Sequence, residues 1–474
     1  MTSTPAPDVA RLHTLHEHLR QLALADPTPD AADTLMRLRQ ELSTRERLAA
    51  LLQGALDFHG EDSSYASHDL HAFAAKFPPQ LPRAFIRGLT QPGDVVLDPM
   101  MGSGTALVEA LLEGRHAIGL DIDPLALRLG QVKTARWEVA PLREAGHRAL
   151  ARAGALLASD AAVEQALAQR FDQRTRAFLD YWFFPSTQRE LMALLLAIEE
   201  SDNVPCRHFL ELTFSSIIVT KSGGVARARD LAHSRPHRVE TKIPRNALEQ
   251  FSLRLRKNLT SIAQFQARSA TGAILAGDAR RLPLQDSSIH LIVTSPPYAN
   301  AIDYMRAHKF SLVWLGASMT TLSELRAAYL GSERTQKTHQ AALPDGPEEI
   351  IAHLAACDAK KAAILRKYFV EMKVVLDEMY RVLRHDAPAV VVVGTSTMRG
   401  IDVQTHSCLA DIATYVGFDV VGVAQRRLDR NKRMMPARFG KQTDSIIEQR
   451  MHEEYVIGLL KPDCEGGTSY ARSQ

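Results

Sequence analysis

Five residues that follow a mostly apolar run have the types and the spacing for chemistry on an amine. Residues 289–293 are followed by Thr-Ser-Pro-Pro-Tyr at 294–298. Each proline ring fixes its own φ and drives the residue before it out of the helical region, so Ser295 and Pro296 are held extended. The hydroxyl of Ser295 and the carbonyl of Pro296 therefore present two hydrogen-bond acceptors to one point.

Two such acceptors suit an exocyclic amine on an aromatic ring. This amine is a poor nucleophile because its lone pair is delocalised into the ring, and hydrogen bonds from its N–H groups favour a more pyramidal nitrogen. Preorganised polar groups of this kind are a strong source of rate enhancement. Tyr298 adds a flat face on which a base taken out of a duplex can stack. The alternative is a proline-rich turn after a buried strand.

A glycine turn lies upstream, between a short apolar strand and a helical pattern. The sequence is Asp98-Pro-Met-Met-Gly102-Ser-Gly104-Thr105. Glycines there tolerate unusual φ and let the backbone approach a ligand, while the free N–H groups of the following helix suit a carboxylate. Residues 117–121 are expected to form the next strand, which ends in Asp121, a residue placed to bind ribose hydroxyls. A nicotinamide or flavin site and a purely structural turn are the alternatives.

Together these segments resemble the class I S-adenosylmethionine-dependent DNA amino-methyltransferases, particularly those with a Ser-Pro-Pro-Tyr motif that modify N4 of cytosine. The family's glycine motif, Asp-Pro-Phe-x-Gly-Ser-Gly-Thr, falls on residues 98–105, with Met100 in place of phenylalanine. Methionine is apolar and adaptable, so it can still pack against a cofactor.

The resemblance implies S-adenosylmethionine as cofactor. Residues 71–79 resemble the element that encloses its methionine end, and Asp278 would accept a hydrogen bond from its adenine amino group. Because an aspartate at a strand end also caps helices, capping is the alternative for Asp278. The expected cofactor-binding residues are Lys76, Phe77, Asp98, Pro99, Met100, Gly102, Ser103, Gly104, Thr105, Asp121, Ile122, Asp278 and Ala279.

The resemblance also implies direct methyl transfer, without a covalent enzyme intermediate, to a cytosine flipped out of duplex DNA. The cytosine amine would donate hydrogen bonds to Ser295 and to the Pro296 carbonyl, and Tyr298 would stack on the base. Positioning then carries much of the catalysis. The expected catalytic residues are Ser295, Pro296, Pro297 and Tyr298. A serine at this position favours cytosine N4, because an acidic or amide side chain favours adenine N6.

Other functions remain open from the sequence alone. Adenine N6 methylation uses the same fold, and RNA or protein amino-methyltransferases use related Pro-Pro-Tyr loops. A DNA-binding module on a degenerate methyltransferase fold is a further alternative, against which the intact motifs argue. Methylation at C5 of a pyrimidine is not expected, because Pro205-Cys206 lies outside a strand-loop context and no Glu-Asn-Val motif occurs.

The order of these patterns predicts an α/β fold: a doubly wound, mostly parallel, seven-stranded methyltransferase sheet with an antiparallel last strand, plus a largely helical insertion. Its 474 residues exceed a usual single domain, so extra modules are expected. The expected parts are a helical N-terminal appendage (1–58), a catalytic domain in two pieces (59–135 and 271–461), a helical, partly basic insertion (136–270) and a flexible tail (462–474).

The insertion is the candidate for target recognition. Residues 221–257 contain ten lysines or arginines against three acidic residues, while the whole chain carries only +3. This local excess favours contact with DNA phosphates, although a solvated helical face is the alternative. A second basic stretch, 426–441, lies between the last two expected strands. The residues expected to bind DNA are Lys221, Arg227, Arg229, Arg235, Arg238, Lys242, Arg430 and Arg433.

Two details qualify this assignment. Enzymes with this motif order usually carry the recognition region between the third strand and the catalytic loop, whereas here the insertion precedes the expected third strand. Residues 308–340 are a second candidate for contacts around the target base, and the apolar first half of this segment is expected to pack as core.

The remaining expectations concern partners and setting. Double-stranded DNA is the expected partner, and a role in restriction-modification would add a cognate restriction endonuclease; epigenetic marking is the other setting. Cys206, Cys357, Cys408 and Cys464 lack metal-ligand spacing, so no metal site is expected. With no apparent signal peptide and no long apolar run, a cytoplasmic, nucleoid-associated protein outside the membrane is expected. The oligomeric state and the recognition sequence stay open.

Overall fold

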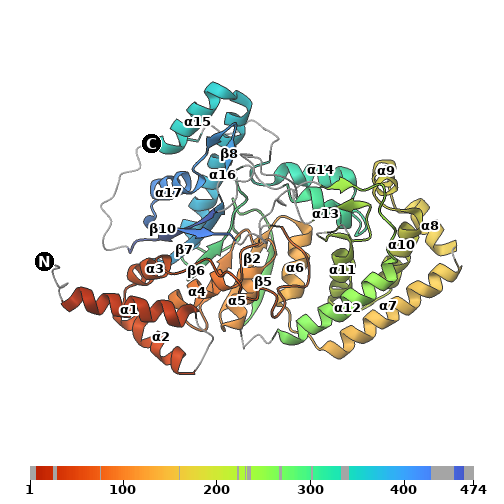
Figure 1. The fold of residues 1–474 in the computed structure, drawn as a ribbon, viewed down its shortest axis with the longest axis horizontal. Helices are drawn as coiled ribbons and strands as arrows, with labels where there is room; N and C mark the ends of the chain where they lie inside the picture. Colours follow the sequence, from red (N-terminus) through yellow and green to blue (C-terminus); the bar gives the residue numbers. More distant parts are fainter. Residues whose placement is uncertain are drawn as a thin grey trace, which may run out of the picture.

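The computed structural model describes residues 7–24, 29–74, 76–159, 161–220, 222, 224–229, 231, 236–265, 270–299, 303–332, 341–394, 396–428 and 453–463. A sheet with helices on both faces forms one lobe, and the helices of the insertion form a second lobe beside it (Figure 1). Among the described helices, none combines the length and the apolar character needed to cross a membrane.

Seven strands form the central sheet, in the order β10-β11-β7-β6-β1-β2-β5. Their bounds are β1 Val95–Asp98, β2 His116–Asp121, β5 Gly272–Ala276, β6 Leu291–Thr294, β7 Pro388–Gly394, β10 Asp419–Arg427 and β11 Glu453–Leu460. Five neighbouring strands, in the sheet order β5-β2-β1-β6-β7, pair in parallel. The strand β11 pairs antiparallel with both β7 and β10. The predicted doubly wound sheet with an antiparallel last strand is confirmed.

Alternate residues of the central strands enter two separate cores. Val391 and Val393 pack with α15 (Asp345–Cys357), α16 (Ala359–Val382) and α17 (Thr405–Val416). Val390 and Val392 pack on the other face with α3 (Thr44–Leu52), α4 (Gln80–Leu89) and α5 (Thr105–Leu112). Since side chains of a strand alternate between faces, the apolar run of β7 supplies both cores at once.

The N-terminal helices pack directly on the catalytic lobe. They are α1 (Pro7–Leu24), α2 (Pro29–Glu41) and α3, whose Leu48 and Leu52 lie over Gly458 of β11. The N-terminal segment is helical as expected, and α3 covers one end of the sheet.

The insertion follows α6 (Pro124–Thr134), between β2 and β5, as expected. Its helices are α7 Val139–Ser159, α8 Ala161–Gln169, α9 Gln173–Trp182, α10 Pro185–Glu199, α11 Val204–Ile218 and α12 Ala247–Gln264, with a small hairpin of β3 (Ala228–Arg229) and β4 (His237–Arg238). Their buried side chains form one core with Phe310 of α13 (Met305–Leu312) and with Trp314, which lies just after that helix. The apolar segment after the catalytic loop therefore packs in a hydrophobic core, as predicted. This core belongs to the helical lobe.

The remaining elements are α14 Met319–Ala328 and the short hairpin of β8 (Thr397–Met398) and β9 (Ile401–Asp402). The domain boundaries proposed from the sequence stay predictions.

Candidate active site

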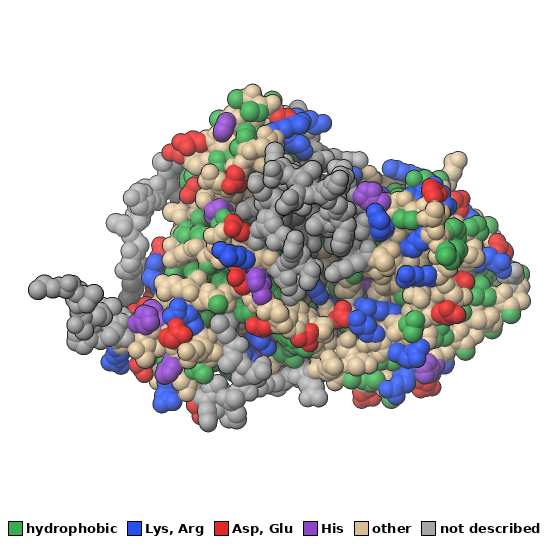
Figure 2. All heavy atoms as spheres, in the orientation of Figure 1, with side chains coloured by type: hydrophobic (Ala, Val, Ile, Leu, Met, Phe, Trp, Pro, Cys, Tyr) green, Lys and Arg blue, Asp and Glu red, His purple; other side chains and the backbone are tan. Residues whose placement is uncertain are grey.

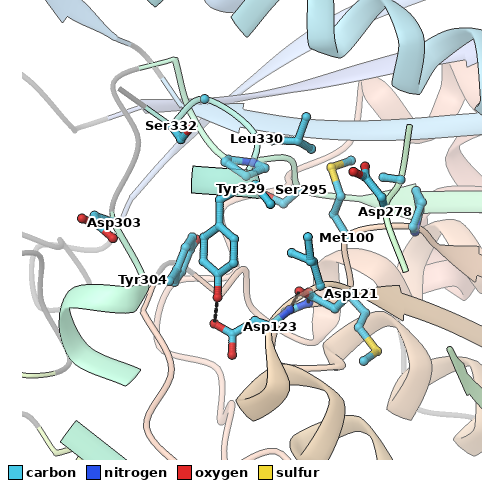
Figure 3. Close-up of a pocket in the computed structure, with 18 of the residues that line it drawn as sticks. Met100, Asp121, Asp123, Asp278, Ser295, Asp303, Tyr304, Tyr329, Leu330 and Ser332 are labelled. Carbon is cyan, nitrogen blue, oxygen red and sulfur yellow. Dashed lines mark hydrogen bonds between the residues drawn. The ribbon is translucent and has the colours of Figure 1, made fainter. Parts of the chain in front are cut away.

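A cavity of about 420 Å³ opens beside the carboxyl ends of β1, β2, β5 and β6 (Figure 3). The sheet order reverses between β1 and β6, and open α/β sheets bind ligands at such a switch point. Its size is in the range of small-molecule and cofactor sites. The expected cofactor residues that line it are Lys76, Phe77, Asp98, Pro99, Met100, Gly102, Ser103, Thr105, Asp121, Ile122, Asp278 and Ala279.

The glycine turn has the backbone that its sequence predicts. Gly102 and Gly104 have φ of 47° and 72°, in the left-handed region that favours glycine. Gly104 does not line the cavity, and its position as N-cap of α5 explains its type. The buried ammonium of Lys133 in α6 donates to the Ser103 carbonyl at 2.8 Å. The turn is thus fixed by a side chain that the sequence did not single out.

Asp98 joins the glycine turn to the catalytic segment. The hydroxyl of Thr294 donates to Asp98 Oδ1 at 2.7 Å, and both residues are buried. Thr294 ends β6 immediately before Ser295. Burial raises the pKa of Asp98 to about 7, although the hydrogen bond from Thr294 acts to lower it. The bond therefore fixes where the Ser-Pro-Pro-Tyr segment leaves the sheet.

Asp121 already has partners in the protein. One carboxylate oxygen accepts from Gly102 N at 2.8 Å and the other from Asp123 N at 2.9 Å. Burial, with a smaller contribution from Asp123, raises the pKa of Asp121 to about 6. The carboxylate braces the glycine turn as well as lining the cavity, and its contact with ribose stays a prediction.

Asp278 is held by Arg280 rather than by a helix start. Its carboxylate accepts from Arg280 Nε at 2.9 and 3.0 Å and from the backbone N of Arg280 at 2.9 Å, in a turn. Burial raises the pKa of Asp278, but the bonds from Arg280 outweigh it and leave the pKa below its usual value. Helix capping does not describe this aspartate.

The four expected catalytic residues divide into two groups. Ser295 and Pro297 line the cavity, whereas Pro296 and Tyr298 do not. The hydroxyl of the half-buried Tyr298 donates to Glu454 Oε1 at 2.8 Å, and the Tyr298 ring lies against Gly394 at the end of β7. Stacking of a base on Tyr298 stays a prediction, because the Tyr298 ring packs against β7 and does not line the cavity.

Several cavity residues were missed by sequence reasoning. The rings of Phe73 and Tyr304 stack at a centroid distance of 5.5 Å, and both line the cavity. Asp123 Oδ2 accepts from the Tyr329 hydroxyl at 2.8 Å and lies 2.6 Å from His308 Nδ1. Phe73 falls within the segment assigned to the cofactor, so its aromatic type was a usable signal. The Asp123 contacts join distant parts of the chain, so no local pattern predicted them.

The lining fits an adenosyl cofactor that carries a positive charge. Met100, Ile122 and Ala279 offer apolar surface, while the carboxylates of Asp121 and Asp278 offer acceptors for hydroxyl and amino groups. Glycines with left-handed φ allow close approach of the backbone.

Comparisons with known proteins agree with this fit. Residues 51–131 match the N6_N4_Mtase family model, described as DNA methylase. The Type II methyltransferase M.MvaI of Kocuria varians is 24% identical over 383 residues, which cover 75% of this chain and 83% of that protein. M.BsoBI of Geobacillus stearothermophilus is 24% identical over 53% of each chain, and M.MjaII of Methanocaldococcus jannaschii is 36% identical over 16% of this chain and 14% of its own. Residues 51–131 thus belong to the N6/N4 type of DNA methylase, and the similarity to M.MvaI extends over most of the chain. S-adenosylmethionine is its methyl donor.

The methylase uses several of its expected DNA-binding cations internally. Arg227 and Arg238 both pair with Glu240, at 2.7 and 3.2 Å, and they lie over the rings of Phe184 and Tyr181. On the visible face of the helical lobe, acidic and basic side chains are interspersed (Figure 2). The charge count of residues 221–257 therefore overstates the positive charge available to a partner.

Lys242 and Arg426 have structural partners as well. The Lys242 ammonium donates to the carbonyls of Ser222, Ala226 and Ala228, which uses its three protons. Arg426, the first residue of the second basic stretch, is buried and pairs with Glu454 at 2.6 Å. Arg229 is exposed on β3. The expected cations Lys221, Arg235, Arg430 and Arg433 lie outside the described residues.

Adding a methyl group at Gly394 should displace Tyr298 and lower turnover. A Cβ there would lie 2.5 Å from Tyr298 Cε2, and the ring is rigid. We expect Gly394→Ala to lower kcat on DNA on the order of 10- to 100-fold, because small misplacements of a catalytic segment are costly. Gly154→Ala on α7, where a Cβ has open space, is the matched control. Equal kcat for Gly394→Ala and wild type would exclude a catalytic role for the Tyr298 position.

Asp98 should make stability depend on pH. Its folded pKa of about 7 lies above the ordinary value of 3.8, so it favours folding at low pH and this contribution is lost as pH rises from about 4 through 7. Asp98→Asn retains an acceptor for Thr294 but cannot titrate. Between pH 5 and pH 8, the unfolding midpoint of wild type should therefore fall more steeply than that of Asp98→Asn. Parallel curves would contradict the raised pKa.

Proposed function

We propose that this methylase transfers a methyl group from S-adenosylmethionine to the exocyclic N4 of a cytosine flipped out of duplex DNA. The observation that carries the proposal is the position of Ser295, which lines the cofactor cavity at the end of β6. Its neighbour Thr294 is tied to the glycine turn by Asp98. The backbone just before the Ser295 hydroxyl, which would orient the amine, is thus held by a residue of the cofactor-binding turn.

The chain's own residues would act mainly by positioning. The Ser295 hydroxyl accepts a hydrogen bond from the cytosine amine and directs its lone pair toward the cofactor. The same role for the Pro296 carbonyl stays a prediction, because Pro296 does not line the cavity. When bound, the cofactor supplies an electrophilic methyl group. Phe73 and Tyr304, stacked beside the glycine turn, exclude water from this side of the cavity. The proton of the amine leaves to water after transfer.

The serine supports cytosine over adenine as target. In enzymes with this motif, an acidic or amide side chain at the position of Ser295 favours adenine N6, so a single hydroxyl favours cytosine N4. The relatives M.MvaI and M.BsoBI are named Type II methyltransferases. We therefore propose that the methylase modifies a specific duplex site and works beside a cognate restriction endonuclease.

Product analysis tests this function directly. The protein is incubated with labelled S-adenosylmethionine and unmethylated genomic DNA, and the nucleosides are separated by mass spectrometry. N4-methylcytosine is the expected product. N6-methyladenine would overturn the target base, and label in structured RNA but not in DNA would overturn the substrate class.

Removing the Ser295 hydroxyl should affect chemistry and not cofactor binding. We expect Ser295→Ala to lower kcat about 100-fold, because removing one preorganised polar partner typically lowers kcat on this scale. The Kd for S-adenosylhomocysteine, measured by calorimetry, should stay within about threefold of wild type, since the cofactor contacts are elsewhere. Ser252→Ala in α12 serves as control. An active Ser295→Ala variant would exclude the catalytic assignment.

Arg229 and Lys242 should respond differently to loss of charge. Arg229→Gln removes an exposed cation, so the slope of log affinity for DNA against log salt should fall by about 0.9. Lys242→Gln removes a donor shared by three carbonyls, so it should lower the unfolding midpoint and leave the salt slope unchanged. Fluorescence anisotropy across a salt series measures the slope. A reversed pattern would place Lys242, and not Arg229, at the DNA.

A further inference from the structure

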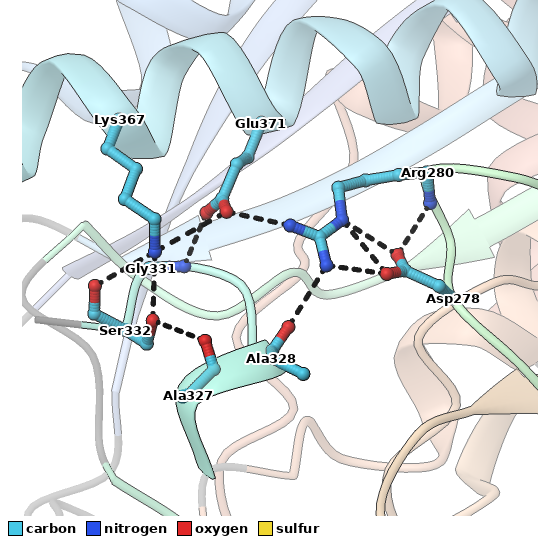
Figure 4. A network of polar contacts seen from close by, with 8 residues as sticks. All are labelled: Asp278, Arg280, Ala327, Ala328, Gly331, Ser332, Lys367 and Glu371. Atoms are coloured by element: carbon cyan, nitrogen blue, oxygen red, sulfur yellow. Dashed lines mark hydrogen bonds and ion pairs between the residues drawn. The ribbon is translucent and has the colours of Figure 1, made fainter. Parts of the chain in front are cut away.

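Arg280 lies between two walls of the cavity and contacts both (Figure 4). On one side its guanidinium donates from Nη2 to Asp278 Oδ2 at 2.5 Å and from Nε to both oxygens of that carboxylate. On the other side the same Nη2 donates to the Ala328 carbonyl at 3.0 Å. The second terminal nitrogen, Nη1, donates to Glu371 Oε1 on α16 at 2.7 Å. One side chain thus joins three segments that are distant in sequence.

The second wall is the segment 327–332, here named the strap. Ala328, Tyr329, Leu330, Gly331 and Ser332 all line the cavity. The Tyr329 side chain reaches from the strap to Asp123, the N-cap of α6 just after β2 (Figure 3). The strap therefore supplies part of the cavity lining and is joined through Tyr329 to the segment that follows β2.

Two side chains of α16 hold the strap in place. The backbone N–H of Gly331 donates to Glu371 Oε2 at 3.0 Å. The Lys367 ammonium donates to Ser332 O at 3.1 Å and to Ser332 Oγ at 2.8 Å, and it lies 3.4 Å from Glu371 Oε1. Glu371 consequently serves both Arg280 and the strap.

The charges of this network alternate along its length: Asp278, Arg280, Glu371 and Lys367. The side chains of Glu371 and Lys367 are only 10% and 7% exposed, so solvent screens their interactions weakly. In such a network, loss of one member leaves a neighbouring charge unpaired in a poorly hydrated place. A disturbance at Asp278 can therefore reach the strap through Arg280, both directly at the Ala328 carbonyl and by way of Glu371.

We propose that Arg280 is a positioning residue that couples adenosyl recognition to ordering of the strap. It orients the Asp278 carboxylate for the adenine amino group, and with the same guanidinium it fixes the strap across the cavity. The coupling is reciprocal, so cofactor binding orders the strap and an ordered strap favours cofactor binding. This inference rests on the proposed cofactor role of Asp278, and it is independent of which base is methylated.

Hydrogen exchange of the strap with and without S-adenosylhomocysteine tests the coupling in the full chain. In wild type, saturating ligand should slow exchange of peptides covering 327–332. In Arg280→Gln the ligand should still bind, with Kd and cofactor KM raised about tenfold and kcat changed less than threefold. Its strap should exchange at the same rate with and without ligand. Equal ligand protection of the strap in wild type and Arg280→Gln, or an unchanged Kd, would overturn the proposal.

Companion variants separate coupling from a loss of structure. Glu371→Gln leaves the Asp278–Arg280 pair intact, so strap protection should fall while Kd rises less than in Arg280→Gln. Arg280→Lys retains the charge but lacks the planar fork, so it should recover part of the affinity for S-adenosylhomocysteine and none of the strap protection. Lys373→Gln, which removes an α16 cation paired with Asp377, is the matched control and should alter neither readout.

The outcomes also distinguish this proposal from the proposed function. Failure of wild type to bind S-adenosylhomocysteine would contradict the cofactor site itself. Binding without any strap response would contradict the coupling alone. If Arg280→Gln does not fold, Glu371→Gln decides, since undiminished strap protection in that variant overturns the proposal.

Discussion

The site depends on parallel pairing of β1 with β6 at the point where the sheet order reverses. This pairing puts the glycine turn after β1 beside the Ser-Pro-Pro-Tyr segment after β6. The buried bond from Thr294 to Asp98 closes the junction. A cofactor held by one segment and a base held by the other would then meet in one cavity. Without the pairing, the two motifs are separated by almost two hundred residues of chain.

The glycine turn is held from several directions, and each restraint comes from another part of the fold. Asp121 accepts its Gly102 N–H, Lys133 donates to its Ser103 carbonyl, and Phe73 lies against Gly102. Glycine makes the turn sterically allowed but gives it no rigidity. Preorganisation for a ligand therefore requires these neighbours, since the turn itself costs conformational entropy to fix.

The helical lobe takes part in the architecture of the active site. Phe310 and Trp314, which follow the catalytic segment in the chain, are buried in its core. The downstream end of that segment is therefore anchored in the lobe proposed for target recognition, while its upstream end is anchored in the sheet. Forces from contacts made by the lobe can reach the cavity through α13, because packed cores transmit displacement.

The sequence by itself determined the fold class, the cofactor and the family. Apolar strands, left-handed glycines and acidic strand ends are local patterns, and their order along the chain specifies a doubly wound sheet. Only the tertiary structure decided the partners of the charged and aromatic residues. It joined Arg280 to Glu371 of α16, turned the Tyr298 hydroxyl to Glu454, and engaged Lys242 and Arg426 in internal contacts. Secondary structure depends on neighbours in sequence, whereas the fate of a long polar side chain depends on groups that folding brings to it from distant segments.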